Sequence, residues 1–281
     1  MSVFFNSKPF KQLSHIPGEF GQPYVGLFPR FLKSSKESHR YLYDTYGPVV
    51  KVALLGQPSI MLYHPDGIEK ILYDKLNVFS SHQGYANIDD VFPRGLLFRD
   101  GEDHHFHRRI MQAAFTPKAL QGYIPDLNRN AKIYLDHYDK QSDVLFYPDV
   151  KHALLTTAST VFMGAKDEKE IAFLSSHYRE LLNGTRSVLR VDLPFLPWGK
   201  MIQTRKELVN YFLENAKNKR ASNNNDMYTL LCQATDEDGN TYDDHEIADH
   251  MNFLMFAAHD TLSGQLSSMV YRLAAHPEWQ D

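Results

Sequence analysis

The segment Ala257–Thr261, which reads AAHDT, brings small residues, an acid and a hydroxyl together inside the most apolar part of the chain. Small side chains let a bulky group approach the backbone of a buried helix. The Thr261 hydroxyl can bond back to a carbonyl three or four residues earlier, and such local distortions often mark functional sites. The alternative is an ordinary polar patch on the outward face, because Asp260 lies at the wrong helical angle to share the stripe of Ala258 and Leu262.

A second segment, Gly101–Arg109, opens a predicted helix with three histidines and two arginines. His104 and Arg108 are four residues apart and therefore lie on one face of that helix. A directed imidazole N–H beside a guanidinium fork suits a carboxylate or a phosphate. The pair could therefore bind an anion, but on the residues alone three histidines and two arginines favour a basic, solvated start of a helix.

Three histidine patterns resemble metal-binding arrangements. His245 and His250 are five residues apart rather than the four of a zinc-protease helix, which excludes a shared metal. The histidines of 104–107 have no carboxylate cluster nearby, which favours solvated side chains. The adjacent pair His259 and Asp260 occurs in all-helical metal-dependent phosphohydrolases, and this class of enzyme stays open as an alternative.

The spacing of apolar residues predicts a mainly α chain with a small β-hairpin near its N-terminus. The hairpin pairs Val49–Leu55 with Ser59–Tyr63 across a turn at residues 56–58, and a loop rich in Gly, Asp, Ser and Phe covers 75–101. The 221–226 stretch, with three consecutive Asn, is the best candidate for a flexible linker. Other helices are expected at about 31–46, just after residue 65, from 102, and at about 120–135, 149–163, 167–184 and 200–220.

The long helix that carries Ala257–Thr261 is the clearest element of the sequence. Asp243 is a good N-cap, and Glu246 three residues on completes a variant of the capping box. Apolar residues then recur at helical spacing to about Ala275, before Pro277 ends the pattern. A helix of that length is roughly 50 Å long, so it must cross the whole domain.

Composition excludes several classes of partner. The 281 residues are 43% apolar and 23% charged, and their net charge of −4 gives no broad basic field for nucleic acid. The longest apolar run, Phe253–Ala258, is far shorter than the roughly 20 residues that span a bilayer, and the N-terminus shows no signal peptide. The sequence therefore predicts a soluble, cytoplasmic protein with no nucleic-acid partner and no transmembrane segment.

Several segments, in the same order, resemble the cytochrome P-450 family of haem-thiolate monooxygenases. Ala257–Thr261 is similar to the family's small–Gly–any–acid–Thr pattern, and Leu273–Gln280 is similar to the end of its central helix. Gly101–Pro117 looks like the family's C helix, and the Asp236–Gly239 turn and the apolar Leu193–Trp198 loop fit as well. The resemblance implies a cytochrome P-450-like fold that is incomplete after the central helix.

The resemblance implies roles for the long helix. In the family, the acid and the threonine of this helix lie over the distal face of the haem and organise water that delivers protons to dioxygen. Asp260 and Thr261 are therefore the implied catalytic residues. Ala257 and Ala258 are the implied small residues against the cofactor, with Ala258 in place of the usual Gly.

The resemblance also implies a cofactor, a substrate class and an electron donor. His104 and Arg108 would bind the propionates of haem b. The implied reaction is hydroxylation of a lipophilic small molecule with dioxygen and NAD(P)H-derived electrons, supplied through a reductase or a ferredoxin. The implied substrate-lining residues are Phe92, Leu96, Leu97, Phe195 and Leu254.

The cysteine departs from the family pattern. The family's iron ligand is a cysteine in a Phe-x-x-Gly-x-x-x-Cys loop far beyond the long helix. The one cysteine here, Cys232, precedes that helix and has Asn225 seven residues earlier. No metal ligand is therefore expected in this chain. The sequence is interpreted as a truncated member of the family that forms a single incomplete domain over 1–281. The alternatives are a non-catalytic remnant that binds no haem and, less favoured, the phosphohydrolase.

Overall fold

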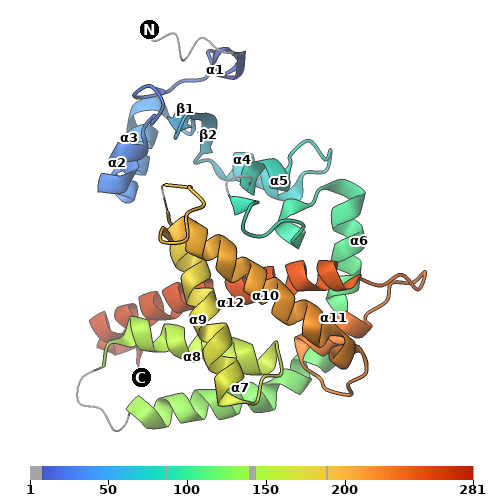
Figure 1. Cartoon of the computed structure of the whole chain (residues 1–281). Coiled ribbons are helices and arrows are strands. Elements are labelled where there is room, and N and C mark those ends of the chain that lie inside the picture. The colour runs from blue at the N-terminus through green and yellow to red at the C-terminus, as the bar shows by residue number, and fades with distance from the viewer. Residues whose placement is uncertain (1–7, 86–87, 139–143, 188, 281) are drawn as a thin grey trace. The chain divides into compact units, whose positions relative to one another are not determined.

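The computed structural model describes residues 8–85, 88–138, 144–187 and 189–280, with the backbone alone for His259. Helices dominate, and one two-stranded antiparallel sheet follows the third helix (Figure 1). The mainly α fold with a small hairpin is therefore confirmed. The α-helices and strands are α1 (Lys8–Gln12), α2 (Phe28–Lys33), α3 (Ser35–Tyr46), β1 (Val49–Leu54), β2 (Gln57–Leu62), α4 (Pro65–Tyr73), α5 (Ser81–Tyr85), α6 (Gly101–Met111), α7 (Pro117–Tyr138), α8 (Phe146–Val161), α9 (Glu168–Thr185), α10 (Pro197–Arg220), α11 (Met227–Gln233) and α12 (Asp244–Ala275). Short 3-10 helices of the described residues are η3 (Leu96–Phe98), η4 (Gln112–Phe115) and η5 (Pro277–Trp279).

The chain separates into two compact units, Met1–Phe79 and Ser80–Asp281. The first unit holds the hairpin and its small core, and the second holds every segment to which the sequence assigns chemistry. A single domain over 1–281 stays a prediction.

The hairpin of the first unit turns earlier than the sequence predicts. Leu55 and Gly56 form its two-residue turn, and both have positive φ, at 47° and 79°. Two left-handed residues match the twist of the flanking strands, as in a type I′ turn. Gln57 and Pro58 therefore belong to β2, where Pro58 is tolerated because this strand pairs on one side with β1.

One predicted helix at 31–46 forms two helices in the structure. Ser34 has an extended backbone between α2 and α3, and its hydroxyl accepts a hydrogen bond from the Glu37 N–H at 3.3 Å. Serine is a strong N-cap because this bond satisfies a free amide of the first turn. The serine therefore ends one helix and starts the next.

Helix α12 crosses the helical body of the second unit (Figure 1) and packs against α8, α10 and α11. Asp243 and Glu246 form the complete capping box that the sequence predicts. The buried stripe of the helix contains Ile247, Met251 and Met255. Leu262, expected in the same stripe, is 40% exposed, since the last part of α12 lies largely at the surface.

Residues 221–226 connect two packed helices and do not form a free linker. Asp226 is buried, caps the unpredicted helix α11 through the Thr229 N–H at 2.9 Å, and accepts a bond from Lys219 Nζ at 2.9 Å. A buried carboxylate with these partners holds the connection in place. In the sequence, the three consecutive Asn before Asp226 suggested a flexible segment and gave no sign that the Asp226 carboxylate would be buried.

A close approach between α9 and α10 yields a stability prediction. A Cβ added at Gly184 would lie 2.1 Å from the Met201 Cβ, whereas one added at Gly264 of α12 would meet nothing within 4 Å. We expect Gly184→Ala to lower the free energy of unfolding by about 1–3 kcal/mol through overpacking. Gly264→Ala should raise it by about 0.5–1 kcal/mol through helix propensity. Urea unfolding followed by circular dichroism measures both, and equal effects of the two changes would contradict the close packing.

Candidate functional site

Asp260 lies in α12 and is held by two cations. Lys151 of α8 places its Nζ 2.6 Å from Oδ1, and Arg186, just after α9, places Nη2 3.4 Å from Oδ2. The side chains of Asp260 and Lys151 are 30% and 19% exposed, so water screens their attraction only in part. The carboxylate therefore ties three segments together, which a solvated outward patch would not do.

Thr261 makes the back-bond that the sequence predicts. Its Oγ1 donates a hydrogen bond to the Ala257 carbonyl at 2.7 Å, and α12 stays α-helical through this point. The expected loosening of the helix is therefore not seen. The Thr261 side chain is exposed, and because its hydrogen is engaged, its oxygen is left to accept a bond from water. Ala257 and Ala258 beside it are half-buried.

His104 and Arg108 lie on one face of α6, as their spacing predicts. Burial, and after it the positive charge of Arg108, lowers the pKa of His104. Among the described residues, neither side chain makes a hydrogen bond or an ion pair. A neutral imidazole beside an exposed, unpaired guanidinium can bind an anion such as a carboxylate.

The prediction of solvated histidines is wrong for His107. Its Nδ1 lies 2.9 Å from Nε2 of His250 in α12, and the ring of Tyr242 stacks on it at 5.1 Å. The Tyr242 hydroxyl donates a hydrogen bond to the His107 carbonyl. Burial lowers the pKa of His250 to about 3, so this ring is neutral at physiological pH. His107 faces the core because it shares the buried face of α6 with Ile110.

An aromatic face on α12 meets the segment before α6. Phe92 is buried and packs on Phe253 and Phe256, with ring centroids 5.8 and 4.3 Å apart. Phe98 of η3 also packs on Phe253, at 6.1 Å. The predicted lining residues Leu96, Leu97 and Leu254 are half-buried beside this cluster. The arrangement offers apolar surface next to the Ala257–Thr261 segment.

Sequence reasoning missed Phe253 and Phe256, although a signal was present. Phe253, Ala257 and Thr261 are spaced i, i+4 and i+8, so they lie along one helix face. By contrast, Phe195 lies in the loop between α9 and α10 and is 70% exposed. The structure does not bring Phe195 together with the aromatic face, and its lining role stays a prediction.

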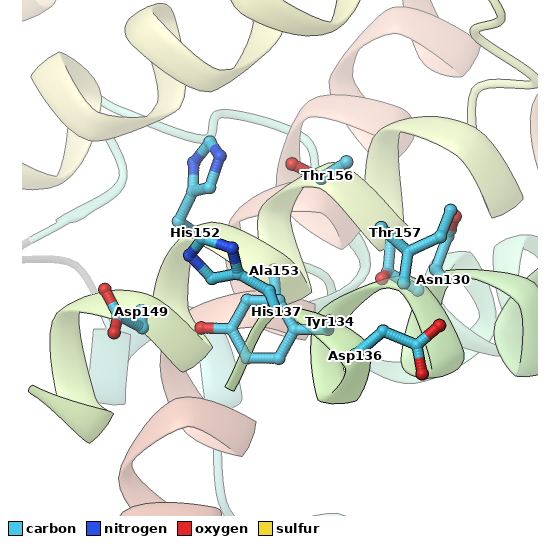
Figure 2. Close-up of a pocket in the computed structure, with 10 residues that line it drawn as sticks. Asn130, Tyr134, Asp136, His137, Asp149, His152, Ala153, Thr156 and Thr157 are labelled. Atoms are coloured by element: carbon cyan, nitrogen blue, oxygen red, sulfur yellow. The ribbon is translucent and has the colours of Figure 1, made fainter. Parts of the chain in front are cut away.

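A hollow between α7 and α8 lies apart from these residues. It has a volume of about 570 Å³, and Figure 2 shows polar side chains from both helices around it. The Thr156 hydroxyl lines it and has no hydrogen-bond partner in the part of the chain that the structure describes. None of the residues singled out in the sequence lines this hollow.

The structure gives no positive support to the metal-dependent alternative. Within the described ranges, no group of three or more His, Cys, Asp or Glu side chains could hold a metal ion. Asp260 is engaged by Lys151 and Arg186, and the His259 side chain lies outside the described part of the chain.

Cys232 in α11 is buried at 1% exposure. Burial raises the pKa of its thiol to about 12, although the nearby Arg220 acts in the opposite direction. The thiolate, not the thiol, binds metals. Cys232 belongs to the hydrophobic core of the second unit, so a haem iron could not reach its sulfur without disrupting that core.

Comparison with known proteins identifies the family. The cytochrome P450 family model matches residues 16–281. The chain belongs to the cytochrome P450 family. Among curated P450 proteins, it is 36% identical to a putative cytochrome P450 136 of Mycobacterium tuberculosis and 26% identical to a taxane 13-alpha-hydroxylase of Taxus cuspidata. These alignments cover 97% and 98% of the chain but 56% and 59% of the relatives, so the chain spans little more than half their length.

Solved P450 structures share the fold. A retinoic acid-bound cyanobacterial CYP120A1 matches with a TM-score of 0.81 and 26% identity, over 94% of this chain and 61% of that chain. The cytochrome P450DA heme domain matches with a TM-score of 0.76 and 21% identity, over the same shares. The predicted P450-like fold is therefore confirmed for the part that this chain covers. No described helix is long and apolar enough to cross a membrane.

The residues present fit one part of a P450 haem site. The neutral His104 imidazole and the Arg108 guanidinium, unpaired among the described residues, suit a propionate, and Ala257 and Ala258 leave the backbone of α12 approachable. Cys232 does not fit as the thiolate, because it is buried and protonated. Among the described residues, this chemistry would suit the propionates and an open distal face of a haem, but not the thiolate.

Proposed function

We propose that this chain carries the distal part of a haem-dependent monooxygenase that hydroxylates a lipophilic small molecule. The supporting observation is the Ala257–Thr261 segment of α12, in which an anchored acid and a back-bonded hydroxyl follow two small residues. The haem iron, bound to a thiolate from outside these residues, would supply the oxygen chemistry, with NAD(P)H-derived electrons from a reductase or a ferredoxin. We also propose a cytoplasmic location.

The chain's own residues would hold water and move protons. Thr261 Oγ1, which donates to the Ala257 carbonyl, accepts a hydrogen bond from a water and fixes its position. Asp260 stays close to this water because Lys151 and Arg186 hold its carboxylate. The ionised carboxylate has no proton of its own to give, but it can accept one and return it to the ordered water, and the two groups together would form a proton relay.

Two further sets of side chains would position the haem and the substrate. His104 and Arg108 would bind the propionates by charge-assisted hydrogen bonds. The Phe92, Phe253 and Phe256 cluster would exclude water and favour an apolar substrate. Relatives are named for a taxane, ent-kaurenoic acid, beta-amyrin and abscisic acid, and these names support a lipophilic substrate.

A fusion protein tests the proposed function. We would join residues 1–281 to the part of the mycobacterial P450 136 that follows the matched region, and load it with haem. With a redox partner and a panel of lipophilic compounds, we expect oxygen from labelled dioxygen in the product. A fusion that binds no haem would support the inert remnant. Phosphate-ester hydrolysis by the 281-residue chain with a divalent metal would support the phosphohydrolase.

A further inference from the structure

The hollow between α7 and α8 has the size of a small-molecule site. Its volume of about 570 Å³ falls within the roughly 300–1,000 Å³ typical of ligand pockets. Its described lining includes Asp136 and Asp149 but no Lys or Arg. His137 and His152 also line it, and an imidazole side chain gains a positive charge only as the pH falls. The hollow therefore favours a cation over an anion near neutral pH.

Asp149, in the first turn of α8, is the acid of this hollow that is open to a ligand. The residue is half-buried, and its carboxylate makes no hydrogen bond or ion pair with the rest of the described chain. Figure 2 shows the Tyr134 hydroxyl on the side of Asp149, and burial, Tyr138 and the Asp149 charge together raise the pKa of Tyr134. Asp136, by contrast, is paired with Lys132 at 3.2 Å.

Neutral oxygen acceptors lie on the same two helices. Thr156 follows Asp149 by about two turns on one face of α8, and its buried hydroxyl has no partner among the described residues. Such a hydroxyl costs free energy, and threonine in a helix has two accessible χ1 rotamers, so Oγ1 can turn into the hollow. Asn130 of α7 donates to Thr160 Oγ1 at 2.6 Å, which leaves its amide oxygen able to accept a bond. These oxygens match the N–H donors of an ammonium group.

The hollow lies away from the exposed apolar side of α7. Leu120, Ile124 and Leu127 form that side, and all three are exposed. At about 100° per residue, Ile133 of the hollow lies at least about 120° round the helix from each of them. A segment or protein that packs on these apolar side chains therefore need not cover the hollow.

We propose that the hollow binds a small organic cation, a primary ammonium group on a short carbon chain. The ammonium donates hydrogen bonds to the Asp149 carboxylate, the Thr156 hydroxyl and the Asn130 amide oxygen, and its carbon chain lies on Ile133 and Ala153. A metal ion fits less well, because the described His, Cys, Asp and Glu side chains form no group of three that could hold one. The site does not rest on the proposed function, since no residue assigned to haem, protons or substrate lines the hollow.

Probes that share one carbon chain test the site: n-butylammonium, 1-butanol and butyrate. Titrated into the isotope-labelled 281-residue chain near neutral pH, n-butylammonium should give saturable NMR shift changes confined to amides of α7 and α8. 1-Butanol and butyrate should bind at least about tenfold more weakly, because neither carries a positive charge. Equal binding of 1-butanol, tighter binding of butyrate, or no saturable change in these helices would overturn the proposal.

Two matched variants locate the charge that binds the ammonium. Asp149→Asn should weaken n-butylammonium binding at least about tenfold, the loss expected for one charge-assisted hydrogen bond. Asp136→Asn removes the other acid of the hollow but should change the affinity by less than about threefold, because Lys132 already pairs with that carboxylate. Equal losses from the two changes would show attraction by net charge alone and would contradict the proposal.

Thr156→Val tests the buried hydroxyl. Valine keeps the shape of threonine and removes a hydroxyl that has no partner in the described chain, so the midpoint of thermal unfolding should not fall. The affinity for n-butylammonium should fall about three- to tenfold. A lower midpoint with unchanged affinity would assign the hydroxyl to the fold and overturn its part in the site. None of these measurements needs haem, so an inactive fusion would refute the proposed function without affecting them.

Discussion

Thr261→Val is expected to lower product formation by the haem-loaded fusion by about 10²–10⁴-fold, the range of a proton-transfer role. Valine keeps the shape of threonine but removes the oxygen that would hold the relaying water. Haem and substrate affinity should stay within about twofold, because the side chain is exposed and anchors neither group. Product formed per NADPH oxidised, with the peroxide released, is the measurement.

Thr261→Ser is the matched control for this change. Serine keeps a hydroxyl that can donate to the Ala257 carbonyl and accept from water, so most of the coupling should return. If Thr261→Val mainly loses haem, or if serine behaves like valine, the hydroxyl does not act in proton delivery.

Arg108→Ala is expected to weaken haem binding by about ten- to a hundredfold. This is the loss of affinity expected when one charge-assisted hydrogen bond to a carboxylate is removed. The side chain is exposed and is not engaged by any described residue, so its removal should not change the fold. Equilibrium titration of the 281-residue chain with haem, followed at the Soret band, gives the affinity.

Arg109→Ala separates a directed contact from general electrostatics. Arg109 is the next residue of α6, is also exposed and carries the same charge, but it lies about 100° further round the helix. Its loss should change haem affinity by less than about threefold, the scale of a screened surface charge. Equal losses from both changes would show that α6 attracts haem only by its net charge.

Patterns that repeat along the chain could be predicted from the sequence. The capping box of Asp243 and Glu246, the back-bond of Thr261 and the shared face of His104 and Arg108 all depend on neighbours within one or two helical turns. Helical geometry fixes such relations before any tertiary contact forms. The mainly α fold class could be predicted for the same reason, because it follows from the helical spacing of apolar residues along the chain.

Contacts between distant segments could not be predicted in this way. Lys151 and Asp260 are 109 residues apart, and Arg94 and Asp249 are 155 apart. Spacing within one helix says which face a residue occupies but not which helix covers that face. His107 is an example. The three histidines and two arginines around it indicated a solvated helix start, whereas the packing of α6 on α12 buries its side chain.

We propose that these 281 residues carry the distal and propionate side of a P450 haem site, without the thiolate. The most direct test is the spectrum of the haem-loaded chain after reduction and addition of carbon monoxide. We expect saturable haem binding without the red-shifted Soret band of thiolate-ligated haem, because the only cysteine is buried and protonated. A red-shifted band that disappears in Cys232→Ser, or a failure to bind haem at all, would contradict the claim.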